Sequence, residues 1–523
     1  MKKTLSMLLA AALICNFSTI MQDTASAIDA ATYEEYNRQV NILKESEFPD
    51  PEIRYSIITE NDFEYHIYDT FAILSECQNT DIIDAVIPAS VNGLPVVGCV
   101  GTPFGHCHKL STITLPDTFE HFSWYNLIDN TVVKLGSTEE YIPSVSKIIV
   151  SDSNPFYTVE NGMLYTKDMK TLIGCPPAMG IKELNISDKA DTIGDYAFYA
   201  CLDLKNAVIP SFIKHLNCNI FTGCFNLESA EIPESITALP GDTFFYCSSL
   251  KKVTFKGRIQ TIGFGAFDEC TSLTDFKIPD TVTQIGVHAF KNAGCVENID
   301  GLKYVDNWLV DSDDDIQKAV VREGTVGIAE MSLFIKKNLS YTEIPSSVEN
   351  LGLGIVSGSL SSELLSEIHY RAHHIPEKAI AAAKTSSDIY IYAPDCDIFD
   401  SEKTIPATYK IRKKDNVDIT NTNIETEEIK YLTGDIVIHG YAGSTAQEYA
   451  EKYNRKFEAI TPSGDANGDG NFNISDIVTA QKILLGSSNY KIKDWKSLDL
   501  DNNNKLDSFD LCLLKKKLLK SHK

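Results

Sequence analysis

The chain has 523 residues, 43% of them hydrophobic, and a formal net charge of −25 at pH 7. That length suffices for several domains or for one long repeat array. The negative charge disfavours nucleic acid and anionic membranes as partners, because both repel an acidic protein. The acidic residues are spread along the chain rather than gathered in one tail, which indicates a role in solubility.

Residues 1–27 have the pattern of a secretory signal peptide. Residues 1–3 give a basic start, 5–14 a short apolar core, and 25–27 a small-residue cleavage site. The core is too short to cross a bilayer of about 30 Å, and no later segment has the apolar length of a transmembrane helix. We expect cleavage after Ala27 and release of the mature chain; a retained N-terminal anchor is the alternative.

Residues 28–60 follow the signal peptide and contain a predicted helix between residues 33 and 44. The first coil of a repeat array has an open edge that invites pairing with another chain. We therefore predict that residues 28–60 form an N-terminal cap over the array.

A regular repeat occupies the middle of the chain. Phenylalanines recur every 23 residues, most are followed three residues later by a cysteine, and each cysteine is followed three residues later by a leucine. The positions are Phe198, Phe221, Phe244, Phe267 and Phe290; Cys201, Cys224, Cys247 and Cys270; and Leu204, Leu227, Leu250 and Leu273. Such a period is typical of a solenoid, in which each coil buries its apolar face against its neighbours. Alternating residues such as 206–209 predict short strands in a parallel sheet, about 4.8 Å apart.

The repeat resembles the BspA-type leucine-rich repeats of bacterial surface proteins. Residues 278–290 follow that family's pattern, Ile-Pro-x-x-Val-x-x-Ile-Gly-x-x-Ala-Phe, almost position by position. Residues 87–110 give an earlier copy, and 344–348 a later, less regular one. The resemblance implies an α/β repeat fold, a leucine-rich-repeat solenoid with short parallel strands, over residues 61–460.

Other segments also match features of that family. Residues 161–165 and 304–309 resemble its β-hairpin insertions, and residues 440–450 resemble its closing helix. Ser444 and Gln447 predict a capping box at the start of this helix.

The cysteines need a separate interpretation. Of 13 cysteines, Cys15 lies in the signal peptide, and an exported chain with the others would normally carry disulfides. Several of them, however, stand at one repeat position, where a small buried side chain is wanted. Stacked positions have parallel Cα–Cβ bonds, a poor geometry for a disulfide. We favour buried thiols, with disulfides as the alternative.

Some motifs suggest a further metal site or a catalytic site, but the neighbouring residues do not support either. The acidic run 311–315 begins like a calcium loop, but Ile316 stands where a turn residue is needed, so we interpret it as an acidic surface loop. His373 and His374 have no carboxylate or cysteine at ligand spacing, which favours a solvated pair. Carboxylate pairs for glycoside cleavage could still lie on a sheet face, because sequence spacing does not reveal them. No catalytic residue is assigned.

The array ends before a separate C-terminal module. Residues 395–430 predict an irregular, polar closing section, and residues 461–464 (Thr-Pro-Ser-Gly) are a short linker of residues that interrupt helices and strands. The module therefore covers residues 461–523.

Two copies of one calcium-loop pattern occupy this module. Oxygen-bearing side chains stand at loop positions 1, 3, 5, 9 and 12, and position 7 offers its backbone carbonyl, as calcium requires. The predicted ligands are Asp465, Asn467, Asp469, Asn471, Asn473 and Asp476 in the first loop, and Asp499, Asp501, Asn503, Lys505, Asp507 and Asp510 in the second. Position 6 needs a left-handed turn, which Gly470 supplies and Asn504 tolerates. We predict two calcium ions; two acidic turns without metal are the alternative.

Each loop is followed by one helix, and position 12 is Asp where an EF-hand has Glu. The apolar residues at helical spacing are Ile477, Ala480, Ile483 and Leu484, then Leu511, Leu514 and Leu518. The duplicated loop and helix resembles a type I dockerin, which implies a small all-α calcium-binding module whose partner is a cohesin module of a scaffoldin. Such dockerins usually contact the partner through loop positions 10 and 11. These positions are Ile474, Ser475, Ser508 and Phe509. Because the two pairs differ, we expect one binding orientation to dominate.

Two classes of function are compatible with these modules. One is a secreted, non-catalytic interaction protein, associated with a cellulosome or the cell surface, whose array binds an unknown protein or glycan. The other is a cellulosomal enzyme of the glycoside hydrolase type with an unrecognised active site. The array leaves no room for a separate catalytic domain, which favours the first class, and so we predict that the protein is not an enzyme.

Overall fold

The computed structural model describes residues 55–129, 144–336, 338–358, 366–377, 379–381, 387–402, 404–405, 409–411, 430–432, 436–460, 463–467, 472–486, 495–501 and 505–521. The predicted signal peptide and the predicted helix at 33–44 lie outside these residues. The chain forms two compact units, one made of Met1–Lys205 and Phe212–Cys224, the other of Asn206–Ser211 and Phe225–Lys523. Within the described residues, every helix is too short or too polar to span a bilayer.

The first unit begins with a mixed sheet whose strand order is β1-β2-β3-β6-β5. Its strands are β1 (Ser56–Glu60), β2 (Phe63–Ile67), β3 (Ala72–Cys77), β6 (Leu94–Cys99) and β5 (Ser90–Val91). A parallel sheet follows, made of β4 (Asp84–Val86), β7 (Thr112–Leu115) and β8 (Lys147–Val150), together with the short helix α3 (Trp124–Ile128). The core beneath them is apolar and fully buried at Tyr65, Leu74 and Phe104.

The same unit continues with the first predicted hairpin insertion, which the structure confirms. The strands of this sheet are β9 (Tyr157–Glu160), β10 (Met163–Thr166), β11 (Thr171–Gly174), β12 (Thr192–Ile193) and β14 (His215–Leu216). Strands β9 and β10 pair antiparallel, and the turn residues Asn161 and Gly162 have φ values of 53° and 77°. This Asn-Gly pair suits a two-residue hairpin turn, which needs positive φ at both positions.

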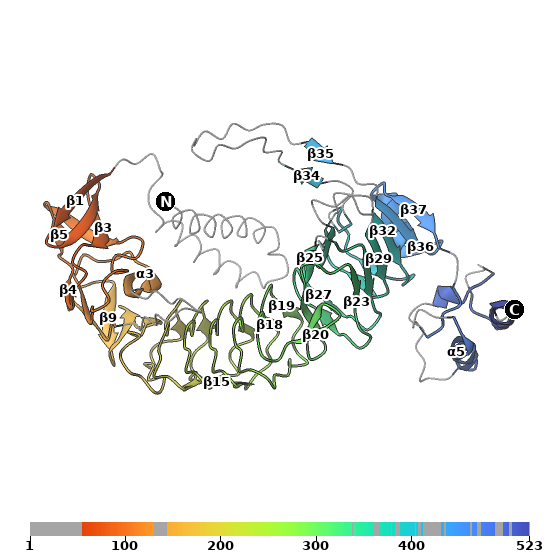
Figure 1. Ribbon diagram of the computed structural model, residues 1–523, viewed down its shortest axis with the longest axis horizontal. Helices are drawn as coiled ribbons and strands as arrows, with labels where there is room; N and C mark the ends of the chain where they lie inside the picture. The colour runs from red at the N-terminus through yellow and green to blue at the C-terminus, as the bar shows by residue number, and fades with distance from the viewer. Residues whose placement is uncertain are drawn as a thin grey trace. The chain divides into compact units, whose positions relative to one another are not determined.

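The second unit contains coils in the predicted parallel arrangement (Figure 1). One sheet consists of β13 (Asn206–Val208), β15 (Ser229–Ile232) and β17 (Lys252–Phe255), and another of β16 (Ala238–Leu239), β18 (Thr261–Ile262) and β19 (Gln284–Ile285). In the first sheet Asn206 pairs with Ser229 and Ser229 with Lys252, so each pairing joins equivalent positions of consecutive repeats. Strand pairing in the sheet therefore follows the predicted period of 23 residues.

The recurring phenylalanines form the centre of the coils. In the first unit the rings of Phe198 and Phe221 stack at 5.5 Å between centroids. In the second unit Phe267 stacks on Phe244 at 5.6 Å and on Phe290 at 5.2 Å. All five rings are buried. Each ring thus contributes to two coils at once, which makes the coils mutually dependent.

The later coils of the second unit form two larger sheets and one further sheet of three strands. The first has the order β20-β21-β22-β24-β27, the second β23-β26-β29-β32-β36-β37 and the third β25-β28-β31. Their strands are β20 (Glu297–Ile299), β21 (Leu302–Val305), β22 (Trp308–Ser312), β23 (Lys318–Val320), β24 (Gly327–Ile328), β25 (Leu333–Lys336), β26 (Tyr341–Ile344), β27 (Asn350–Leu351), β28 (Val356–Gly358), β29 (Ser366–Tyr370), β31 (Ile380–Ala381), β32 (Ser387–Ile391), β36 (Ile436–Gly440) and β37 (Lys456–Ala459). Strands β21 and β22 pair antiparallel, which confirms the second predicted hairpin.

The prediction that residues 395–430 form an irregular section is partly wrong. Within it lie β33 (Asp397–Ile398), which pairs with β30 (His374–Ile375), and β34 (Tyr409–Ile411), which pairs with β35 (Lys430–Leu432). The strand β33 extends the ladder of the preceding coil, so backbone pairing overrides the polar composition of the segment.

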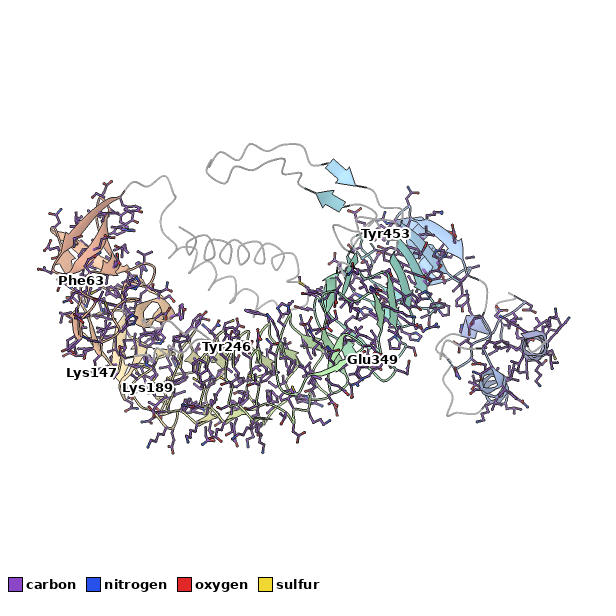
Figure 2. All side chains as sticks on the ribbon, viewed as in Figure 1. Phe63, Lys147, Lys189, Tyr246, Glu349 and Tyr453 are labelled. Atoms are coloured by element: carbon purple, nitrogen blue, oxygen red, sulfur yellow. The ribbon has the colours of Figure 1, made fainter. Side chains whose placement is uncertain are left out.

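The closing helix is present as α4 (Thr445–Lys452), but its predicted capping box is incomplete. The Ser444 side chain accepts from the backbone N–H of Gln447, as expected. The Gln447 Oε1 atom accepts from the N–H of Gly443 at 2.7 Å, one residue before the cap position. The C-terminal cap of the helix is Tyr453, labelled in Figure 2. Its ring lies 4.8 Å from that of Tyr449.

The repeat cysteines are buried, and two of their thiols donate to backbone oxygens. Cys224 Sγ donates to the carbonyl of Phe198 at 3.0 Å, and Cys270 Sγ to that of Phe244 at 3.2 Å. Burial raises the pKa of Cys224 to about 12. A thiol with such a pKa stays protonated and unreactive at neutral pH. By contrast, Cys512 near the C-terminus is exposed.

Replacing Phe267 with Ala should lower the free energy of unfolding by about 3–5 kcal/mol, because the ring is fully buried between two others. Urea denaturation followed by circular dichroism measures this. The control is Phe264→Ala, whose side chain is 46% exposed and should cost at most about 1 kcal/mol. Equal losses in the two variants would contradict the proposed core.

Alkylation should separate the cysteines by exposure. In the native protein at pH 8, iodoacetamide should modify Cys512 quickly and Cys224 only after unfolding, because burial raises the pKa of Cys224 and shields its sulfur. Mass spectrometry of peptides reads out both sites. Repeat cysteines that resist alkylation in denaturant without reductant would show that they are paired, against the buried-thiol prediction.

Candidate calcium site and docking surface

The C-terminal module is built from two helices around a small core. The helices are α5 (Ile474–Leu484) and α6 (Ser508–Ser521), with the 3-10 turn η2 (Trp495–Ser497) between them. Ile477, Ala480, Leu498 and Leu514 are buried at the centre. Half-buried apolar residues such as Phe472 and Leu511 surround them. So small a core gives the module little stability of its own.

The second predicted loop brings three carboxylates together. Oxygen atoms of Asp499, Asp501 and Asp510 all lie within 4.8 Å of one another. Asp499 and Asp510 are buried, and Asp501 is exposed. Negative charges at this separation repel one another strongly away from water. A divalent cation between them would remove that repulsion, and calcium binds several carboxylate oxygens in this way.

The first loop also buries the predicted ligands at its first and last positions. Asp465 and Asp476 are buried, at 7% and 0% exposure. Asp476 Oδ1 accepts from the N–H groups of Ala466 and Asn467 at 2.9 and 3.2 Å, and so ties the end of the loop to its beginning. The predicted ligands Asp469, Asn471 and Asn503, like Gly470 and Asn504, lie outside the described residues.

Loop positions 9 and 12 also cap the helices, a role that the sequence analysis missed. At α5, Asn473 Oδ1 accepts from Ser475 N–H at 2.8 Å, and Asp476 Oδ2 accepts from Asn473 N–H at 2.7 Å. At α6, Asp507 Oδ1 accepts from Phe509 N–H at 2.7 Å, and Asp510 Oδ2 accepts from Asp507 N–H at 2.9 Å. The patterns Asn-x-x-Asp and Asp-x-x-Asp at the helix starts could have predicted this capping from the sequence.

The charge balance fits calcium at both loops. Among the described residues, the carboxylates of Asp476 and Asp510 accept hydrogen bonds from backbone N–H groups only, although both are fully buried. A buried carboxylate without a cation is costly. Lys505, at position 7, has an exposed side chain, as expected if only its backbone carbonyl faces the ion.

The four predicted partner-binding residues lie at the starts of the two helices. Ile474 is 71% exposed and Phe509 58%, and the two serines, Ser475 and Ser508, are exposed as well. Val478 adds a further exposed apolar side chain to α5. Large apolar side chains that remain in water on a small module are typical of a binding surface.

The prediction that 311–315 is an acidic surface loop is partly right: Asp311 and Ser312 end the strand β22, and only residues 313–315 form the loop, whose lysine contacts were not predicted. Lys303 Nζ lies 3.6 Å from Asp311 and 3.2 Å from Asp313. Lys336 Nζ lies 3.2 Å from Asp314. These ammonium groups supply the positive charge that a metal would otherwise provide.

The prediction that His373 and His374 are a solvated pair is right about their exposure, since the side chains are 35% and 44% exposed, but it missed their carboxylate partners. His373 Nδ1 lies 3.5 Å from Asp395, and His374 Nδ1 lies 3.0 Å from Asp397. Both aspartates belong to the next coil, so the pairing depends on coil stacking and does not show in local sequence spacing.

Comparison with known families identifies two regions. Residues 178–297 match the BspA type leucine rich repeat region, in six copies. Residues 463–519 match the type I dockerin domain. Both resemblances predicted from the sequence are thereby confirmed. Dockerin domains of this type are generally calcium-binding, and neither matched region is of a catalytic kind.

Several solved structures are similar to parts of the chain. A leucine-rich repeat protein from Bacteroides ovatus has 16% identity over 79% of this chain and 99% of its own, with a TM-score of 0.31. A leucine rich cell surface protein from Faecalibacterium prausnitzii has 19% identity over 64% of this chain and 89% of its own, with a TM-score of 0.24. A search of curated proteins finds no match.

Calcium should control the folding of the C-terminal module. At a calcium concentration about 100 times the dissociation constant, one site adds about 2.7 kcal/mol to the folded state. We expect α5 and α6 to melt in chelator while the array keeps its own thermal transition, as measured by circular dichroism and calorimetry.

The matched variants are Asp465→Ala with Asp499→Ala, and Asp280→Ala as a control on the exposed surface of the array. The double variant should lose calcium binding in titration calorimetry, and the control should keep it. Full helicity of the module in chelator would speak against this role of calcium.

Proposed function

Because the chain carries BspA-type leucine-rich repeats and a type I dockerin domain, we propose that it is a secreted, non-catalytic interaction protein of a cellulosome. The dockerin attaches the chain to a cohesin module of a scaffoldin in a calcium-dependent manner. The array presents its sheet faces to a protein or glycan ligand. The duplicated loop and helix, with exposed apolar side chains at both helix starts, carries this proposal.

In this proposal two calcium ions bind one in each loop. The ligands of the first are Asp465, Asn467, Asp469, Asn471, Asn473 and Asp476, and those of the second are Asp499, Asp501, Asn503, Lys505, Asp507 and Asp510. Support comes from the buried carboxylates and from the close approach of Asp499, Asp501 and Asp510.

Calcium binding and partner binding are coupled through the helix starts. Position 12 closes each loop onto the first turn of its helix, and positions 10 and 11 project from that same turn. If a loop does not close, its helix loses its N-terminal cap. The two partner-binding residues of that first turn then have no fixed position. We therefore assign Ile474, Ser475, Ser508 and Phe509 to the cohesin contact.

The proposal also covers export and the layout of the chain. Residues 1–27 act as a signal peptide, 28–60 cap the array, 61–460 form the array and 461–523 the dockerin. The mature protein then functions outside the cell, where calcium is available and cohesin modules are displayed.

Cohesin binding should require both calcium loops. Titration calorimetry with cohesins of the same organism should give no measurable binding for the Asp465→Ala, Asp499→Ala double variant or for the wild type in chelator. Binding that persists in either case would remove the docking function. Turnover of plant-wall glycans by the wild-type chain would favour an enzyme instead.

The two halves of the docking surface should be unequal. Ile474 and Ser475 differ in size and polarity from Ser508 and Phe509, so one orientation should be used. Of the variants Ile474→Ala and Phe509→Ala, one should weaken cohesin binding about tenfold or more and the other less than about threefold. Val208→Ala, on an exposed strand of the array, is the control. Equal losses in the two would mean that both orientations are populated.

A further inference from the structure

One face of the six-stranded parallel sheet carries a row of aromatic rings. Strands β26, β29, β32 and β36 are successive neighbours in this sheet, and Figure 1 shows β29, β32 and β36 side by side. Their middle residues Thr342, Ile368, Ile389 and Ile438 are buried in the core. Because side chains alternate along a strand, the residues next to these point to the opposite face. Glu343, His369, Tyr390 and His439 are directly opposite one another in register on that face.

The rings stack on each other. His369 lies 4.6 Å from Tyr390 with 5° between the ring planes, and Tyr390 lies 4.3 Å from His439 with 11°. Tyr341 lies 4.9 Å from His369 on the other side, and Lys318 Nζ covers the Tyr341 ring at 4.4 Å. Both faces of Tyr390 are therefore covered by imidazoles, which leaves the edges of the stack for a partner.

Hydrogen bonds hold the stack rigid. His369 Nδ1 lies 2.7 Å from the hydroxyl of Tyr392. Arg371 Nε donates to Glu343 at 3.0 Å, and its guanidinium lies 4.3 Å above the ring of Tyr392. Burial opposes the charge of Glu343, but hydrogen bonds from Arg371 and Tyr341 outweigh it and hold the pKa of Glu343 below its usual value. A rigid surface loses little conformational entropy when a partner binds.

Two carboxylates on this face are placed against the usual pairing rule. Glu367 and Asp388 are directly opposite one another on β29 and β32. Like charges in this position destabilise a sheet. Glu367 Oε1 contacts His369 at 2.6 Å and Asp388 Oδ1 contacts His439 at 3.0 Å. Among the described residues, the second oxygen of each has no partner.

The cations of this face are engaged elsewhere. Arg371 pairs with Glu343, Lys456 Nζ lies 3.0 Å from Glu458, and Lys318 lies over Tyr341. The side chains of Glu367 and Asp388 are 42% and 27% exposed, so water reaches both carboxylates. Each carboxylate contacts an imidazole, but among the described residues neither is paired with a lysine or arginine. A local rule that is broken in this way often marks a functional site.

We propose that this face, defined by Tyr341, Glu367, His369, Asp388 and Tyr390, binds a protein partner through an arginine or lysine side chain placed between Glu367 and Asp388. The inference rests on the proposed function, in which the array presents a surface to a ligand. A basic side chain supplies the positive charge that the two carboxylates lack, and a guanidinium can bind both at once. Tyrosine edges around it would exclude water, as in protein interfaces with a few dominant contacts.

A glycan fits this face less well. Sugar rings bind most readily on open aromatic faces, and those of Tyr390 are covered on both sides. Side chains of peptides, by contrast, need only the carboxylates and the edges of the rings. The covered ring faces therefore favour a protein over a polysaccharide.

The test is selection of phage-displayed random dodecapeptides on the immobilised full-length chain. Enriched peptides should contain Arg or Lys and bind more weakly as salt rises, because salt screens charges that are in contact with solvent. In the variant E367Q/D388N their dissociation constants should rise at least tenfold. The matched control E234Q/D280N removes the same charge from exposed positions of the array and should change them less than twofold.

Three outcomes would overturn the inference. They are enrichment of peptides without basic residues, equal loss in both double variants, and binding of neutral plant-wall oligosaccharides or of calcium alone that E367Q/D388N abolishes. Cohesin binding of the same preparations separates this inference from the docking proposal. If the chain binds cohesin but selects no basic peptides, only the proposed basic partner is rejected. If the wild-type chain does not bind cohesin, the docking proposal is rejected.

Discussion

The array depends on one constraint: a single coil cannot bury its own apolar face. Phe267 is fully buried because Phe244 and Phe290 of the adjoining coils cover its two faces. Burial on both sides fixes the register of neighbouring coils, since a slip by one residue would turn a strand's core side chains outward. The same register aligns the outward side chains in rows. The row of Glu343, His369, Tyr390 and His439 is thus a by-product of how the core packs.

This constraint also explains what the sequence could predict. The period, the buried phenylalanines and the first hairpin turn depend on short or constant spacings, and the structure confirms them. The sequence analysis did not predict the aromatic row, because the coils that carry it differ in length. Tyr341 pairs with Glu367, and Glu367 pairs with Asp388. The next partner, opposite Asp388, is Val437, so the intervals between paired residues are all unequal. No fixed period connects these side chains. His374 and its partner Asp397, by contrast, are 23 residues apart, the period of the phenylalanines, so that pair could have been found from the sequence.

In the C-terminal module the residue types identified the ligand pattern, but not the double role of position 12. Asp476 and Asp510 each close a loop through one oxygen and cap a helix through the other. This geometry suits the short Asp side chain, whose carboxylate stays close to the first turn of the helix. The departure from the EF-hand Glu, which the sequence shows plainly, therefore has a local structural reason. It follows from backbone positions that sequence spacing alone does not give.

The two modules differ in what holds them together, and this difference bears on function. The array is stabilised by apolar burial between coils, which calcium does not affect. The dockerin has a core of a few side chains and buries four carboxylates, Asp465, Asp476, Asp499 and Asp510. Its folded state therefore needs a cation far more than the array does. The array is therefore expected to stay folded in chelator, whereas the C-terminal module is not. Under the proposed function, ligand binding by the array and docking by the module would then respond to calcium separately, although both belong to one polypeptide.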